Sequence, residues 1–153
     1  MKLYFFRHGV ADWPDWNGPD SERPLTKGGK KEVRRVAEAL LEGGVKTDVI
    51  LTSPLPRAQQ TAEIAGAVLG TAVSVEGALA PGFDAAALRT LLRAHDGQNV
   101  MFVGHEPDFS RMVEALTGGT VVMAKAGVAR IDMENADEAR GELRWLVTPK
   151  ILR

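Results

Sequence analysis

Two arginines and two histidines stand close behind apolar, strand-like runs of this sequence. Arg7 and His8 follow the run LYFF, with Gly9 directly after them. Arg57 comes shortly after DVILTS, and His105 comes directly after NVMFVG. A guanidinium group matches phosphate oxygens with paired hydrogen bonds and cannot lose its charge. The set therefore predicts an anion-binding site, with a phosphoryl group as the leading ligand.

Three distant segments must come together for such a site to form. In an open α/β sheet, ligands bind at the carboxyl ends of the strands, where loops separate and helix amino termini point free N–H groups into the gap. Each of the four side chains is expected just beyond such a strand end. The topology alone therefore predicts that they converge.

Paired histidines also suggest a metal site. Neighbouring arginines would repel a cation, and no carboxylate or further histidine stands at a usual ligand spacing. We therefore expect no metal and no cofactor. The third histidine, His95, is expected to end a helix, where it complements the helix dipole outside the site.

Apolar runs alternate with helical patterns along the chain, which is typical of a layered α/β domain. Strands are expected at 3–6, 48–53, 71–76 and 99–105, followed by a hairpin of strands at 127–133 and 142–147. The simplest assembly is a single three-layer α/β/α domain over residues 1–153, with a mostly parallel sheet and an antiparallel C-terminal hairpin.

Four helices are expected between these strands. The first is capped by Thr26, ends at Gly43 and Gly44, and has a buried stripe of Val33, Val36, Ala37, Leu40 and Leu41. The second is expected to start at Pro54 and the fourth at Pro107. The buried residues of the third are expected to be Leu88, Leu91 and Leu92.

Composition narrows the partners and the compartment. The formal net charge is −1, and the basic run KGGKKEVRR contains a glutamate on a predicted amphipathic helix. We interpret this run as a solvated helix face and expect no nucleic-acid partner. Without cysteine there is neither a disulfide nor thiol catalysis, which fits the cytoplasm. The start MKLYFF is too short for a secretory signal or a membrane span, so we expect no membrane partner.

The segments FFRHG, LTSPLPRAQQTAE and FVGHEPDFS, in this order and spacing, resemble the histidine phosphatase superfamily, also called the phosphoglycerate mutase-like family. The short length, the segment ERPLTKGG and the lack of a large inserted cap resemble its SixA-type phosphohistidine phosphatases. The resemblance implies that His8 is the nucleophile and that Arg7, Arg57 and His105 hold the phosphoryl group. Arg23 matches a position that faces the same pocket.

Gly9 would let the backbone approach the phosphate closely. His8 must be neutral to attack, and the charge of His105 is expected to depend on whether phosphate occupies the site. We expect a pH optimum between roughly 6 and 8, set by one histidine losing its proton and the other keeping it.

No residue clearly matches the acid that protonates the leaving group in larger relatives. Asp84 in VEGALAPGFD is the nearest candidate, although its position also suits a helix N-cap. Glu76, Glu106 and Asp108 could supply the proton instead. An imidazole leaves more readily than an alkoxide, so a missing acid is tolerable for phosphohistidine.

Three functions stay open at this point. The chain could remove phosphoryl groups from a protein, such as a histidine-containing phosphotransfer domain or a phosphocarrier. It could act on small phosphate esters, or it could be a non-catalytic module that binds phosphate or phosphoproteins. The resemblance and the leaving-group argument favour the first. The third is disfavoured, because a module that only binds phosphate does not need a nucleophilic imidazole between arginines.

Overall fold

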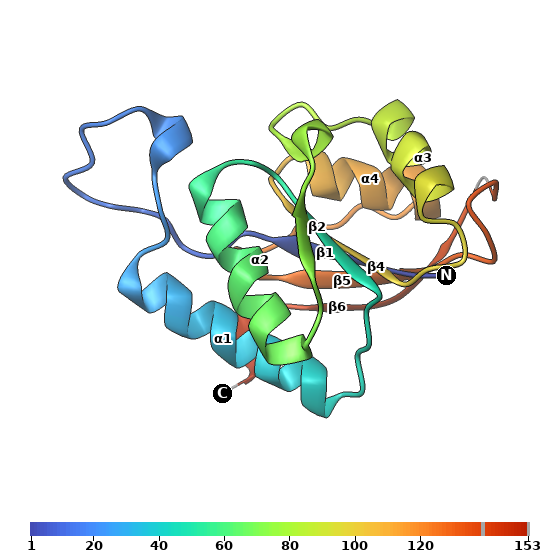
Figure 1. Ribbon diagram of the computed structural model, residues 1–153, viewed down its shortest axis with the longest axis horizontal. Coiled ribbons are helices and arrows are strands. Elements are labelled where there is room, and N and C mark those ends of the chain that lie inside the picture. Colours follow the sequence, from blue (N-terminus) through green and yellow to red (C-terminus); the bar gives the residue numbers. More distant parts are fainter. Residues whose placement is uncertain (139, 153) are drawn as a thin grey trace.

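The computed structural model describes residues 1–138 and 140–152, whose strands form one six-stranded sheet in the order β3-β2-β4-β1-β5-β6 (Figure 1). The strands are β1 (Lys2–Arg7), β2 (Val49–Thr52), β3 (Val73–Val75), β4 (Val100–Gly104), β5 (Val128–Asp132) and β6 (Glu142–Val147). The first four are parallel to one another, whereas β5 is antiparallel to both of its neighbours, β1 and β6. The expected α/β fold and its antiparallel hairpin are confirmed.

Four α-helices cover the two faces of the sheet, with α1 and α2 on one face and α3 and α4 on the other (Figure 1). They are α1 (Lys27–Glu42), α2 (Pro56–Leu69), α3 (Ala85–Ala94) and α4 (Asp108–Thr117). Three short 3₁₀ helices lie in the connections: η1 (Asp20–Glu22), η2 (Gly77–Leu79) and η3 (Pro149–Leu152).

The central strand β1 supplies side chains to both halves of the core. Leu3 and Phe5 pack with the residues of α3 and α4, whereas Tyr4 and Phe6 pack with those of α1 and α2. This alternation follows from the two-residue period of a strand, and it explains why LYFF is apolar throughout. A strand buried on both faces holds the end that carries Arg7 in a fixed place.

Two details differ from the sequence prediction. Helix α2 begins at Pro56 and not at Pro54, because Ser53 Oγ accepts a hydrogen bond from the amide of Leu55 and keeps this stretch outside the helix. Pro56 still occupies the first turn, where its missing N–H costs nothing. Leu41 is 49% exposed. Each residue of an α-helix is rotated about the helix axis relative to the one before it, and this rotation places Leu41 beyond the edge of the buried stripe that Leu40 belongs to.

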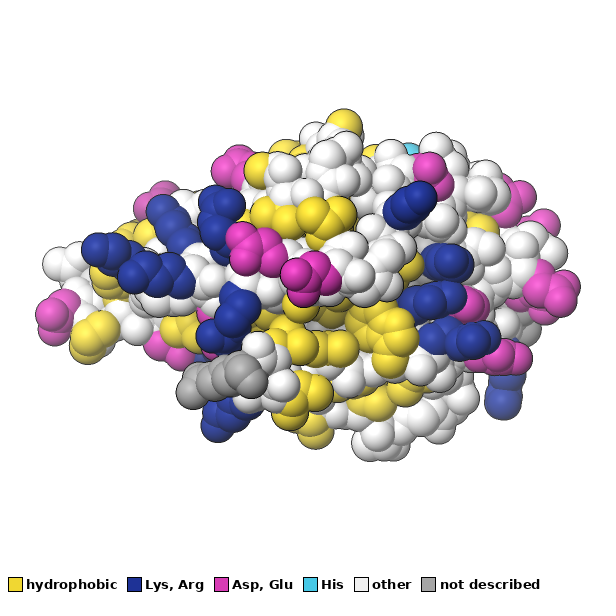
Figure 2. Space-filling view, turned by 90° about the horizontal axis from the view of Figure 1, so that it is seen from below, with side chains coloured by type: hydrophobic (Ala, Val, Ile, Leu, Met, Phe, Trp, Pro, Cys, Tyr) yellow, Lys and Arg dark blue, Asp and Glu magenta, His cyan; other side chains and the backbone are white. Residues whose placement is uncertain are grey.

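The basic run at the start of α1 is a solvated helix face. Lys27, Lys30, Lys31 and Arg34 are exposed, and Arg35 lies 3.6 Å from Glu32. Figure 2 shows acidic side chains among the Lys and Arg side chains of the lower face of the molecule. Across the described ranges, no helix is both long and apolar enough to cross a membrane.

Candidate active site

The ends of three parallel strands carry the predicted site. Arg7 is the last residue of β1 and pairs with Gly104 at the end of β4. The main chain extends the ladder beyond the strands, since the amide of His8 donates to Gly104 O and the amide of Ser53 donates to Val103 O, both at 3.0 Å. His105 then follows Gly104 directly, so the two histidines leave neighbouring strands at the same edge.

A cavity of about 390 Å³ lies at this edge of the sheet. The residues that line it are Arg7, His8, Asp12, Asp20, Arg23, Arg57, Pro81, His105, Glu106 and Lys125. They come from five separate segments, and five of them are the charged or imidazole side chains predicted to hold a phosphoryl group. The expected convergence of the strand ends is therefore present.

The ring of His8 is fixed by its own neighbourhood. Its Nδ1 lies 2.8 Å from the carbonyl oxygen of Gly9, which can only accept, so Nδ1 carries a proton and donates. In the neutral ring Nε2 is therefore the acceptor, and Arg57 Nε donates to it at 3.3 Å. Burial, followed by the positive charges around it, lowers the pKa of His8 to about 3. A neutral imidazole whose lone pair is on Nε2 has the form required of a nucleophile once the Arg57 N–H turns away.

His105 faces His8 across the cavity, with their ring centres 5.2 Å apart. Its Nε2 lies 2.7 Å from Ser53 Oγ. Burial and the charge of Arg57 lower the pKa of His105 to about 4. Both rings are thus neutral near pH 7, and the effect of bound phosphate on the charge of His105 stays a prediction.

The two arginines are each anchored by the main chain. Arg7 donates from Nη1 to Met123 O at 2.8 Å, and Arg57 donates from Nη1 to Asp20 O at 2.9 Å. Within the described part of the chain, Arg7 Nε and His105 Nδ1 are buried without a hydrogen-bond partner. Guanidinium groups held in this way keep their orientation toward an anion.

The loop after β1 folds back to form one wall of the cavity. The indole of Trp13 donates to Pro24 O at 2.8 Å, and that of Trp16 donates to Pro19 O at 3.0 Å. Arg23 also donates to Ala11 O at 2.5 Å. These bonds give the loop a defined shape beside His8 and Arg57.

The sequence and the fold of this chain are similar to those of known proteins. The profile of the histidine phosphatase superfamily (branch 1) matches residues 3–80, which include Arg7, His8 and Arg57. The chain belongs to the histidine phosphatase superfamily. An uncharacterised protein of Picosynechococcus is 44% identical over 99% of both chains.

Within the histidine phosphatase superfamily, the chain is similar to SixA proteins. The phosphohistidine phosphatase SixA of Escherichia coli is 28% identical over 97% of this chain and 94% of its own. A structure of the protein histidine phosphatase SixA complexed with tungstate superposes with a TM-score of 0.87 and 28% identity, covering all of both chains. The predicted membership and its SixA-like character are thus confirmed.

Gly9 is predicted to bind substrate, yet it does not line the cavity of this histidine phosphatase. A Cβ at this position would lie 2.6 Å from Val33 Cγ2, and the amide of Gly9 donates to Thr61 Oγ1 at 3.1 Å. The glycine is therefore required by the close approach of β1 to α1. A direct contact of its backbone with phosphate stays a prediction.

The candidate acids occupy different places. Asp84 caps α3, accepting from the amide of Ala87 at 2.9 Å, and does not line the cavity. Glu76 caps η2 in the same manner. Asp108 is buried and accepts from the amide of Gly82, whereas Glu106 lines the cavity. Glu106 is thus the candidate acid closest to the reacting groups.

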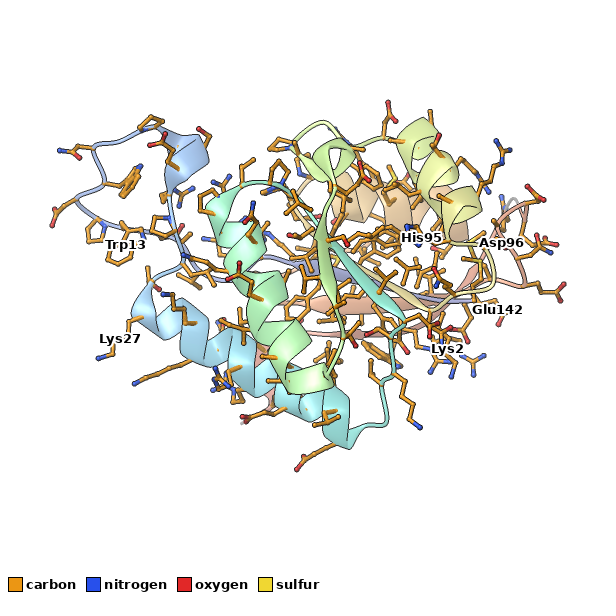
Figure 3. All side chains as sticks on the ribbon, viewed as in Figure 1. Lys2, Trp13, Lys27, His95, Asp96 and Glu142 are labelled. Carbon is orange, nitrogen blue, oxygen red and sulfur yellow. The ribbon has the colours of Figure 1, made fainter. Side chains whose placement is uncertain are left out.

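His95 lies away from the site, as expected. It caps the end of α3, and its Nδ1 lies 2.8 Å from Gln98 Oε1. Figure 3 shows it near the opposite end of the molecule from the loop that carries Trp13. Among the residues that the structure describes, no group of three His, Cys, Asp or Glu side chains could hold a metal ion.

Several residues at the site were not predicted, among them Asp12, Pro81 and Lys125 of the cavity lining. Ser53 and Thr61 are fully buried hydroxyls, and Thr61 links the end of β1 to the first turn of α2 by also donating to Arg57 O at 2.8 Å. Both belong to the segment LTSPLPRAQQTAE. A polar residue beside apolar ones in this segment was the pattern that could have indicated their burial near the site. Asp20 sits in a loop whose course nothing in the sequence predicts.

Proposed function

We propose that this protein is a phosphatase that transfers a phosphoryl group to Nε2 of His8 and then to water. One observation carries the proposal: the Gly9 carbonyl fixes a neutral His8 with Nε2 as acceptor, inside a cavity lined by Arg7 and Arg57. An imidazole in this form can attack phosphorus, and guanidinium groups stabilise the charge on the transferring oxygens.

The reaction runs in two balanced steps. His8 Nε2 first forms a bond to phosphorus while the bond from phosphorus to the leaving group breaks, and the leaving group takes up a proton. Water then attacks the phosphorus, the bond to Nε2 breaks, and one water proton is released as phosphate departs. Neither step requires an oxidant or a reductant.

The other lining residues receive positioning roles in this proposal. Arg7 and Arg57 hold the equatorial oxygens of the phosphoryl group, and His105 supplies a further ring nitrogen across the cavity from His8. Arg23 contributes from the loop after β1. Burial lowers the pKa of His105, but an incoming phosphate dianion favours its protonation, which would strengthen its contact with the anion.

We assign phosphohistidine on a protein as the substrate, for two reasons. The similar SixA of Escherichia coli is a phosphohistidine phosphatase. In addition, an imidazole departs more readily than an alkoxide, so a strong general acid is not required. A histidine-containing phosphotransfer domain or a phosphocarrier is the expected partner, and the cytoplasm is the expected compartment.

Small phosphate esters are the second candidate. The presence of Glu106 in the cavity lining favours them, because this carboxyl group could protonate an alkoxide. Both Glu106 oxygens contact Ser110, however, one of them accepting from its amide at 2.7 Å. Because both oxygens of Glu106 are already engaged by Ser110, we favour phosphohistidine.

Trapping the phosphoenzyme tests the proposal. The protein is mixed with radiolabelled phosphohistidine protein or an aryl phosphate, quenched in alkali, and analysed for phosphohistidine by mass spectrometry. We expect label on His8, and no label and no turnover with His8→Ala, with Lys46→Ala as an exposed control. Normal turnover by His8→Ala, or phosphate bound by the wild type without any hydrolysis, would reject the phosphatase.

A further inference from the structure

The catalytic cavity carries carboxylates as well as cations. Its lining contains the cations Arg7, Arg23, Arg57 and Lys125 and the acids Asp12, Asp20 and Glu106. With both histidines neutral, this lining has an excess of one positive charge. A phosphoryl group carries one or two negative charges, so it alone would use up that excess.

Most of these cations are already paired with carboxylates of the loop after β1. Arg23 lies 2.9 Å from Asp20 and 3.3 Å from Asp12, and Lys125 pairs with Asp12. Arg57 lies 3.5 Å from Asp20. Little positive charge is therefore left at the mouth of the cavity for a second anionic group of the substrate.

Asp20 stands nearest to the reacting atoms among these paired carboxylates. It contacts Arg57, whose Nε contacts His8 Nε2, so a single guanidinium separates this carboxylate from the attacking nitrogen. Its side chain is 73% exposed, and Arg23 and then Arg57 hold its pKa below the usual range. Asp20 is thus a negative charge in the cavity lining, separated from His8 by one guanidinium group.

We propose that the Asp20 carboxylate determines specificity by repelling substrates that carry a second negative charge close to the phosphoryl group. The inference rests on the function proposed above and specifies its substrate class: phosphoramidates or phosphoesters whose leaving group is neutral or cationic. A histidine side chain of a polypeptide satisfies this requirement. A compact phosphorylated carboxylic acid does not, because like charges a few ångströms apart repel even at the dielectric constant of water.

A pair of non-hydrolysable phosphonates tests the charge effect without turnover. The two compounds, 4-carbamoylphenylphosphonate and 4-carboxyphenylphosphonate, are similar in size and differ by one negative charge. We expect calorimetry at low salt to give a dissociation constant at least about fivefold lower for the uncharged amide. Asp20→Asn keeps an acceptor for Arg23 and Arg57 but loses the charge, and it should reduce this preference by roughly threefold or more.

The matched control is Asp15→Asn, which removes a charge from the same loop at a residue outside the cavity lining. It should leave the ratio of the two dissociation constants unchanged. In the wild type, added salt should bring this ratio closer to one, because salt screens the repulsion between charges. Equal affinities of the wild type for the two phosphonates would overturn the proposal, and so would an equal effect of both substitutions. The phosphoenzyme experiment with His8→Ala reports separately on the phosphatase function, so either idea can fail alone.

Discussion

Arg57 Nε donates a hydrogen bond of 3.3 Å to Nε2 of His8, the ring nitrogen whose lone pair would attack phosphorus. The contact joins the first turn of α2 to the end of β1. For attack to occur, this N–H must turn from the nitrogen to a phosphoryl oxygen. Arg57 would therefore orient the ring before substrate binds and stabilise the transferring group afterwards.

The first prediction follows from the shape of this guanidinium. Lysine keeps the charge of Arg57, but it lacks the planar fork that can contact His8, Asp20 and a phosphate oxygen together. We expect Arg57→Lys to lower kcat/KM for an aryl phosphate at least tenfold, or about 1.4 kcal/mol of transition-state stabilisation. Arg34→Lys, on the exposed face of α1, is the control. Unchanged kinetics in Arg57→Lys would show that this arginine does not touch the reacting group.

The second prediction concerns stability at mildly acidic pH. The pKa values of about 3 for His8 and about 4 for His105 lie below the value near 6.5 in an unfolded chain. As the pH falls from about 6.5 toward 4, the unfolded chain therefore binds protons that the folded protein does not, and stability falls. Each histidine adds up to about 1.4 kcal/mol per pH unit to this slope.

Urea unfolding at about pH 7, 6 and 5 measures the slope. His8→Gln removes one of the two linked protons and should make the slope shallower, whereas His95→Gln at the end of α3 is the control. A slope that is the same in wild type and His8→Gln would mean that His8 is not held neutral by the fold.

The third prediction concerns the close packing behind the nucleophile. An alanine at position 9 would bring its Cβ to 2.6 Å from Val33 Cγ2 and 3.3 Å from the Gly29 carbonyl. We expect Gly9→Ala to lower the free energy of unfolding by about 1–3 kcal/mol through overpacking. Gly28→Ala, with nothing within 4 Å and a place in the first turn of α1, should be neutral or slightly stabilising. Equal stabilities for the two variants would contradict this packing account.

The fourth prediction separates the two candidate acids. Asparagine can replace Asp84 as a helix cap, so Asp84→Asn should leave turnover of alkyl and aryl phosphates unchanged. Glu106→Gln removes the carboxyl group that lines the cavity. It should slow alkyl phosphates severalfold more than aryl phosphates, because only the alkoxide requires a proton on leaving. An alkyl-selective loss in Asp84→Asn would identify Asp84 as the acid.

The site residues could be predicted from the sequence because they lie at or shortly after the ends of β-strands, which are recognisable as apolar runs. Arg7 and His105 terminate apolar runs, and a parallel sheet brings such ends to one edge whatever the lengths of the helices between them. The local pattern was therefore enough to place residues that lie 98 positions apart. Most of the buried helix stripes could be predicted for a similar reason, since their spacing reflects one helical period.

The other features of the site depend on tertiary contacts, which no local sequence pattern predicts. The course of the loop after β1 is set by bonds such as Arg57 to the Asp20 carbonyl, so the role of Asp20 was not predictable. The lowered pKa of His105 arises from burial, which only the assembled sheet provides. The steric requirement at Gly9 likewise depends on how closely α1 packs against the end of β1.

A main-chain carbonyl, that of Gly9, holds the Nδ1 side of the His8 ring. A side chain in that place could be lost by a single codon change, but every amino acid supplies a carbonyl oxygen. This hydrogen bond is therefore protected from point mutation at the chemical level and remains exposed only to changes that move the backbone. A random mutagenesis screen for loss of this bond should yield substitutions that shift the end of β1, in its packing neighbours on α1, whereas loss of the contact at Nε2 requires substitution of Arg57.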